Sequence, residues 1–228
     1  MKKLSAVLFL STLSSLSVAG EEEGQFGLGF QVSNNTTTIS VPYRLNSDWR
    51  VEPFLGYSQS SSETDGKDLD GFEESSQYDS EQYNLGVSLA RTLLTQEKLS
   101  LYSGVSLAYV QLDSDSSSSD GRLSETDFTR YEYKYDYQDK AELTGYETAL
   151  SLGLQYQIFD NIELAGEVAL NYRDLSGDVV SSGISTDIRI DKNDSSNNTT
   201  DVDVEQMESD KDESVFYTSS KLIVRIYF

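Results

Sequence analysis

The stretch that decides the fold is Lys221-Leu222-Ile223-Val224-Arg225-Ile226-Tyr227-Phe228. From residue 222 onward every second side chain is apolar, whereas Lys221, Arg225 and Tyr227 share the other face, with Ile223 as the apolar exception. Because successive side chains of a strand point to opposite faces, this alternation predicts an amphipathic β-strand. Such a strand either closes a barrel or forms the edge of an ordinary sheet, and the rest of the chain has to distinguish the two.

The composition excludes several classes of function. The 228-residue chain has no Cys and no His, so it lacks disulfides, thiolate ligands and the commonest general base and metal ligand. Its 39 acidic and 17 basic residues give a net charge of −22, which disfavours nucleic-acid binding because phosphate contacts need a basic surface. We therefore predict a protein that is not an enzyme, has no cofactor and binds no nucleic acid.

The first twenty residues have the pattern of a secretory signal peptide. Lys2 and Lys3 precede the mostly apolar stretch 4–16, and small residues in Ser17-Val18-Ala19 mark a cleavage site. The apolar run is shorter than the roughly 20 residues that a spanning helix needs. We predict a cleaved signal peptide over residues 1–20 and a single β domain over residues 21–228.

Eight segments with period-two alternation follow, and an even count is typical of bacterial membrane barrels. Pro42 weakens the second of them, since proline cannot donate to a hydrogen-bond ladder. The links at 46–48, 94–98 and 157–161 are short, whereas those at 59–82, 113–142 and 174–213 are long and polar. The predicted strands are 25–32, 37–45, 49–58, 83–90, 99–109, 146–156, 162–172 and 214–228.

The three long links carry most of the charge. They hold 29 of the 39 acidic residues and 8 of the 17 basic ones, a net charge of −21 out of −22. Such segments are commonly solvated and disordered. Two parts nevertheless alternate like strands, namely 131–137, with a tyrosine at every second position, and 201–205. These parts are predicted to extend the strands above the membrane, where an exposed edge could bind a partner by strand addition.

Alternation alone leaves open which face of the barrel points outward, because a soluble lipocalin-like barrel would bury its apolar face. The positions of the aromatic residues favour an apolar exterior. They form two rows about ten residues apart, which at ~3.3 Å per residue and a tilt of ~40° matches a lipid-facing band of about 25 Å. The predicted membrane girdle comprises Trp49, Tyr57, Tyr83, Tyr109, Tyr146, Tyr156, Tyr172 and Phe228.

The opposite face is rich in small residues and carries four acids and five bases. An eight-stranded barrel is narrow enough for side chains to fill its interior. Buried charges are tolerated when they are paired, so we predict a lumen filled by an ionic network. This predicted network consists of Arg44, Arg50, Glu52, Glu147, Glu163, Glu167, Arg173, Lys221 and Arg225.

The chain resembles the small eight-stranded outer-membrane β-barrel superfamily of the OmpX, OmpA transmembrane-domain and opacity-protein type. The resemblance rests on the alternating strands, the stretches 41–45 and 51–57, and the terminal Phe228. It implies an all-β, up-and-down transmembrane barrel in the outer membrane of a Gram-negative bacterium, with short periplasmic turns and long acidic extracellular loops. It further implies a monomer that contacts lipid and lipopolysaccharide and whose terminal strand is read by the barrel-assembly machinery.

Two functions remain open after this reasoning. One is a structural or surface-interaction role, in which a side-chain-filled barrel displays acidic loops to a surface ligand or host protein. The other is a small channel for solutes or apolar molecules. A metal site is not predicted, because Asp113-Ser114-Asp115 and Asp68-Leu69-Asp70-Gly71 have calcium-like spacing without the rest of a twelve-residue loop.

Overall fold

The fold is described from a computed structural model, which places residues 24–33, 36–67, 73–126, 129–191 and 198–228. The predicted signal peptide lies outside these described residues, as does the stretch 68–71. Within them, no helix is long and apolar enough to cross a membrane. Almost all of the described chain is β-strand.

Every strand pairs antiparallel with its neighbours, and the sheet closes into a ring. β1 pairs with β9 over six residue pairs, from Gly27 opposite Tyr227 to Val32 opposite Leu222. This pairing confirms that the last strand closes a barrel. The strands are β1 (Gln25–Ser33), β2 (Thr36–Ser40), β3 (Tyr43–Arg44), β4 (Trp49–Lys67), β5 (Glu73–Gln96), β6 (Leu99–Glu125), β7 (Thr129–Phe159), β8 (Ile162–Asp191) and β9 (Thr199–Tyr227).

The ring has eight places, because β2 and β3 occupy one of them, between β1 and β4. Pro42 interrupts this strand, as its missing N–H predicts. The backbone still joins both neighbours at the break, through Val41 N to Pro53 O at 3.0 Å and Gly27 N to Pro42 O at 2.9 Å. The predicted eight-stranded up-and-down barrel is therefore correct.

The acidic segments were predicted as long loops, and this part of the prediction is wrong. The segments 59–82, 113–142 and 174–213 are mostly strand, because β4 continues to Lys67, β7 begins at Thr129 and β9 at Thr199. Cross-strand hydrogen bonding does not depend on side-chain charge, so a ladder can continue into water. The strand extensions predicted for 131–137 and 201–205 are confirmed. The short links at the other rim are also confirmed, with two residues between β5 and β6 and two between β7 and β8.

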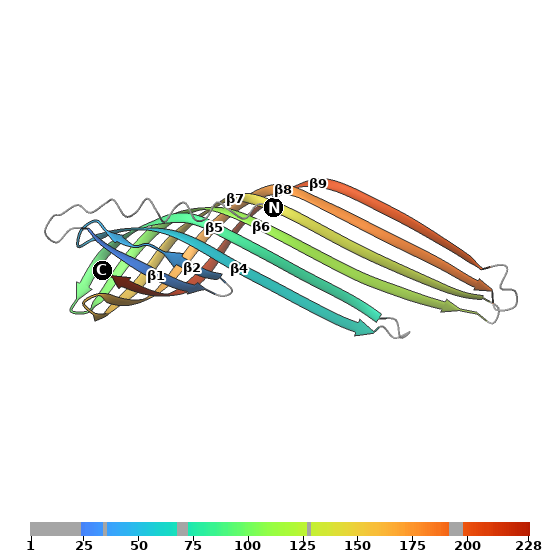
Figure 1. The fold of residues 1–228 in the computed structure, drawn as a ribbon, viewed down its shortest axis with the longest axis horizontal. Coiled ribbons are helices and arrows are strands. Elements are labelled where there is room, and N and C mark those ends of the chain that lie inside the picture. Colours follow the sequence, from blue (N-terminus) through green and yellow to red (C-terminus); the bar gives the residue numbers. More distant parts are fainter. Residues whose placement is uncertain (1–23, 34–35, 68–72, 127–128, 192–197) are drawn as a thin grey trace.

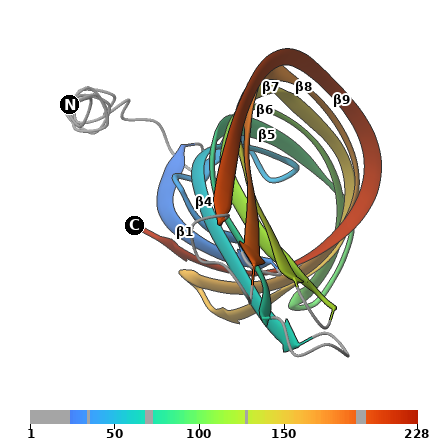
Figure 2. The same ribbon diagram turned by 90° about the vertical axis from the view of Figure 1, so that its right-hand side faces the viewer.

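The six strands β4–β9 thus continue beyond the barrel as an open sheet, which we call the extension. It comprises residues 59–67, 73–82, 111–125, 129–145, 174–191 and 199–215. Figure 1 shows these strands running far past β1 and β2 and bending away from the barrel, while Figure 2 views the molecule from the end of the extension. At about 3.3 Å per residue, residues 129–145 alone reach roughly 55 Å.

Glycines permit close strand approach where the barrel joins the extension. A Cβ on Gly145 would collide with the backbone carbonyl of Asp174, and one on Gly177 with that of Glu142. Both glycines lie in the paired strands β7 and β8, which are tightly coiled at this level. Directly beside them, Val110, Leu143 and Leu175 form a buried apolar cluster. Leu112 and Ala141 pack against this cluster at the junction.

The exposure of the side chains decides which face points outward. Leu150 and Leu170, paired across β7 and β8, are 63% and 50% exposed, whereas Glu52 and Arg225 are each 2% exposed. A soluble barrel would show the opposite arrangement. The barrel is therefore apolar outside and charged inside, as a lipid-facing exterior requires.

Candidate functional site

The lumen is centred on Glu52, which β4 points into the barrel. Arg225 of β9 binds its carboxylate through Nε and Nη2, each 3.0 Å from Oε2, and Arg50 Nε lies 3.3 Å from the same oxygen. Ser40 Oγ donates to Oε1 at 2.5 Å and Gln31 Nε2 donates at 3.3 Å. Gln31 lies in β1, Ser40 in β2 and Arg225 in β9, whereas Arg50 lies in β4 with Glu52. The contacts of Glu52 therefore connect four strands.

A second ion pair closes the lumen toward the short turns. Arg44 of β3 forms an ion pair with the buried carboxylate of Glu163 in β8. Tyr227 donates its hydroxyl hydrogen bond to the same carboxylate at 3.2 Å, and the Arg44 guanidinium lies 3.8 Å from the centre of its ring. This group connects an early strand of the chain, β3, with the last two strands, β8 and β9.

Two further groups lie toward the extension. Glu147 of β7 accepts hydrogen bonds from Arg173 Nη2 at 2.7 Å and from the Tyr217 hydroxyl at 2.6 Å. Glu167 of β8 lies 3.6 Å from Lys221 Nζ and accepts a hydrogen bond from the Tyr102 hydroxyl at 3.1 Å. Each of the four lumenal carboxylates therefore forms an ion pair with a basic residue on a different strand.

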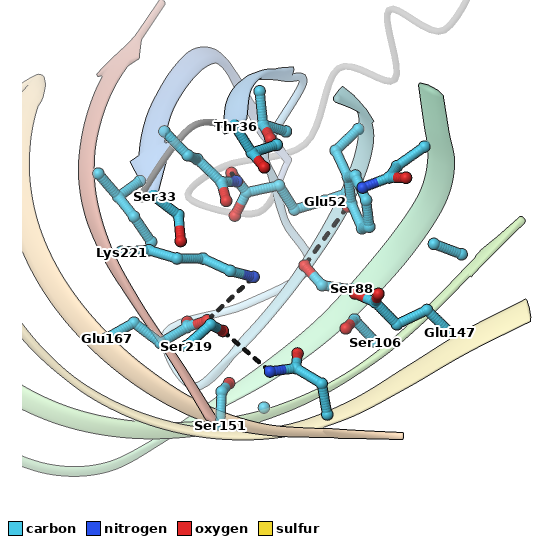
Figure 3. Close-up of a pocket in the computed structure, with 18 of the residues that line it drawn as sticks. Ser33, Thr36, Glu52, Ser88, Ser106, Glu147, Ser151, Glu167, Ser219 and Lys221 are labelled. Carbon is cyan, nitrogen blue, oxygen red and sulfur yellow. Dashed lines mark hydrogen bonds and ion pairs between the residues drawn. The ribbon is translucent and has the colours of Figure 1, made fainter. Parts of the chain in front are cut away.

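A cavity of about 180 Å³ remains between these groups. It is lined by charged residues and by hydroxyl and amide side chains, including Ser106, Ser151 and Asn171. Figure 3 shows Lys221 beside its cross-strand partner Glu167 at the wall of this space, and Ser88 near the backbone of Glu52. The cavity is polar and large enough for several water molecules, and the Arg50–Glu52–Arg225 group lies on the side of the short turns.

The nine charged residues predicted for the lumen all take part in these ion pairs. Sequence reasoning missed the three tyrosines, Tyr102, Tyr217 and Tyr227, that hydrogen-bond to their carboxylates. It also missed the neutral donors Gln31 and Ser40. Alternation had placed Tyr227 on the polar face and could have placed Tyr102 and Tyr217 there too, but which carboxylate each one meets depends on the stagger of strands around the ring.

The girdle residues lie on the outer face of the barrel and meet in cross-strand pairs. Tyr57 packs against Tyr83 with ring centroids 5.1 Å apart, and Tyr109 packs against Tyr146 at 6.0 Å. The partner of Tyr172 is Phe216, at 4.7 Å, which the prediction had omitted. At the other rim lie Trp49, under the Arg91 guanidinium, together with Tyr156 and Phe228. That these rings contact the membrane interfaces remains a prediction.

The outer face of the extension carries a row of acidic residues directly opposite one another. The row crosses five strands, from Glu81 through Asp113, Glu142 and Asp178 to Asp210. Like charges in register destabilise a sheet by a few tenths of a kcal/mol or more per pair. In the described part of the chain, no group of three or more acidic side chains has the arrangement of a metal site.

A closed antiparallel barrel with an exposed apolar exterior and paired charges inside defines an integral membrane β-barrel. The sequence matches the family described as "Outer membrane protein beta-barrel domain" over residues 5–174, and the chain belongs to this family. The protein is therefore an outer-membrane β-barrel protein of bacteria.

Several solved structures of outer-membrane proteins are similar to this chain at low sequence identity. CarO from Acinetobacter baumannii shares 13% identity over 89% of this chain and 97% of its own, with a TM-score of 0.41. A major outer membrane protein from Thermus thermophilus shares 13% identity over 90% of this chain and 99% of its own, with a TM-score of 0.48. No curated protein sequence matches the chain. Likeness at this level carries no argument about function.

Proposed function

We propose that this protein is a structural and surface-interaction protein, whose barrel anchors an acidic β-sheet outside the outer membrane. The observation that carries the proposal is the set of ion-paired groups inside the lumen. Glu52 and Arg50 of β4 form one group with Arg225 of β9, and the Arg44–Glu163 pair forms a second group nearer the short turns. Because the interior of an eight-stranded barrel is just wide enough for side chains to fill, these groups support a lumen that is closed to solutes.

The extension supports the interaction part of the proposal. Only β1 pairs with the free side of β9, and only from Leu222 onward, so the described residues 199–220 of β9 present an unpaired edge. The first fourteen residues of β9 are all exposed, and the segment 199–213 contains seven acids and one base. An unpaired strand edge can add a further strand. The charge favours a partner with an extended basic segment, such as a surface ligand or host protein.

Recordings in planar lipid bilayers test the closed lumen. We expect the purified parent protein to give no conductance steps, because the ion-paired groups occlude the barrel. Glu52→Ala should open a gap beside Arg225 and produce small steps, and the extension variant Glu74→Ala should not. Steady conductance by the parent would reject the closed barrel.

The display of the extension is tested by adding proteinase K to intact bacteria. We expect cleavage within residues 59–82, 113–142 or 174–213, with a protected fragment containing the barrel strands. Protection of all three segments in intact cells, together with cleavage after the outer membrane is opened, would place the extension in the periplasm and reject the proposal.

The polar cavity is the observation that favours the alternative, a small channel for solutes or apolar molecules. It shows that the side chains do not fill the lumen completely. The bilayer recordings distinguish the two functions. Export through the predicted signal peptide, assembly through the terminal strand, contact with lipopolysaccharide and a monomeric, non-enzymatic protein all belong to the same proposal.

A further inference from the structure

The extension carries a row of tyrosines that belongs neither to the ion-paired groups of the lumen nor to the acidic edge of β9. Tyr131, Tyr133, Tyr135 and Tyr137 occupy every second position of β7, on the face that continues the lumen-facing side of Glu147. We call this the inner face of the extension. Tyr133 and Tyr135 are 44% and 46% exposed. Four large rings in a row on an open sheet are unusual, because exposed aromatic surface normally marks a binding site.

The neighbouring strand allows these rings to lie against the sheet. Across from Tyr135 and Tyr137, β8 places Ser185 and Gly183. A Cβ on Gly183 would be only 2.8 Å from the Tyr135 hydroxyl, so this ring extends over the glycine. The rings of Tyr135 and Tyr137 are 6.3 Å apart and nearly parallel, with an angle of 17° between them. The Tyr135 and Tyr137 rings therefore share a common orientation along the strand.

Balanced polar groups flank the row. β6 places Asp120 and Arg122 opposite Tyr135 and Tyr133. On the other side, β8 places Asp187 opposite Tyr133 and Arg189 opposite Tyr131, with the Arg189 guanidinium 5.9 Å from the Tyr131 ring centre. These two acids and two bases directly beside the rings cancel, whereas further along the same face Asp139 of β7 and Asp201, Asp203 and Glu205 of β9 are acidic. Serines at 118, 181 and 185 add hydroxyl groups along the same face.

We propose that the inner face of the extension binds a neutral, linear glycan along the tyrosine row. The C–H bonds on the face of a sugar ring pack against the electron-rich face of an aromatic ring. Carboxylate, guanidinium and hydroxyl groups beside the rings can donate to and accept from sugar hydroxyls. The local charge balance fits an uncharged chain, and the acidity of the whole extension disfavours anionic polysaccharides. The inference rests on the proposed function in placing this face outside the membrane.

Isothermal titration of the purified protein in detergent tests the site. The probes are cellohexaose, maltohexaose and chitohexaose, with a hyaluronan hexasaccharide as the anionic comparison. We expect the parent to bind at least one neutral hexasaccharide and to leave hyaluronan unbound. Tyr133→Ala/Tyr135→Ala should weaken this binding about tenfold or more, because two stacked rings are lost.

Two matched variants show whether the rings themselves are responsible. Glu132→Ala/Lys134→Ala changes the outer face of the same strand, keeps the net charge and should bind like the parent. Tyr133→Phe/Tyr135→Phe keeps both aromatic rings and should retain most of the affinity. This variant keeps the test valid if the alanine variant fails to fold. The proposal is wrong if the parent binds none of the three neutral probes, or if the loss of both rings leaves the affinity unchanged. This titration in detergent is independent of the bilayer and proteinase tests, so the two proposals fail separately.

Discussion

The six strands of the extension also form most of the barrel, yet the two regions place their charges in opposite ways. In the barrel, Glu52 and Arg225 are buried and paired, and leucines such as Leu150 face outward. In the extension, the outer face carries the unpaired acidic row from Glu81 to Asp210. The hydrogen-bond ladder between β7 and β8 runs through both regions without interruption from Thr129 to Gln157.

This difference shows that strand pairing is independent of the surrounding medium, whereas the choice of side chains depends on it. Antiparallel pairing satisfies the backbone N–H and C=O groups between neighbouring strands, in lipid or in water. The outward-facing side chains differ between lipid and water, because an exposed charge is costly in lipid and favourable in water. We therefore predict that the membrane ends where the outer face changes from Tyr83 and Tyr109 to Glu81 and Asp113.

The largest expected effect is the loss of a buried carboxylate. Glu52→Ala leaves Arg225 buried without its partner, which costs about 3–5 kcal/mol. Glu74→Ala removes an exposed carboxylate from the extension and should cost no more than about 0.5 kcal/mol. Urea titrations of both variants in lipid vesicles give the comparison. Equal unfolding midpoints would mean that the two regions do not differ in how they hold charge.

A smaller effect is expected at the junction of the two regions. Gly145→Ala introduces a Cβ that collides with the backbone of Asp174, so the strands must separate locally, at a cost of about 1–3 kcal/mol. Gly166→Ala is the matched control, because no atom lies within 4 Å of its added Cβ. The free energies of unfolding from urea titration should differ between the two variants. A neutral Gly145→Ala would show that the close strand approach is not needed.

The smallest effect concerns the acidic row. Asp178 lies between Glu142 and Asp210, so Asp178→Asn removes two like-charge pairs and should stabilise the protein by about 0.2–1 kcal/mol at low salt. The gain should diminish at high salt, because exposed charges are screened. Asp65→Asn, opposite Ser75, is the control and should change little at either salt concentration. A destabilised Asp178→Asn variant would indicate that the row is held by interactions other than repulsion.

The prediction of the fold succeeded where side-chain alternation carried the information. The alternation of 221–228 identified the closing strand, and the nine charged residues on the polar faces of the segments are those that form ion pairs inside the barrel. The prediction failed for the long acidic segments, because low hydrophobicity and high charge there suggested loops. Continuous pairing with neighbouring strands, such as Ser114 opposite both Ser80 and Ala141, stabilises strands whose own sequence is only weakly β-forming.

The sequence by itself determined the number of strands and which side chains share a face, because a period of two is a local property of the chain. Only the tertiary structure decided that Glu52 meets Arg225 and Arg50, that Tyr102 reaches Glu167, and that Tyr172 packs on Phe216. These contacts depend on the stagger of strands around a closed ring, which sums over every pairing in the barrel. No single segment of the sequence contains that information.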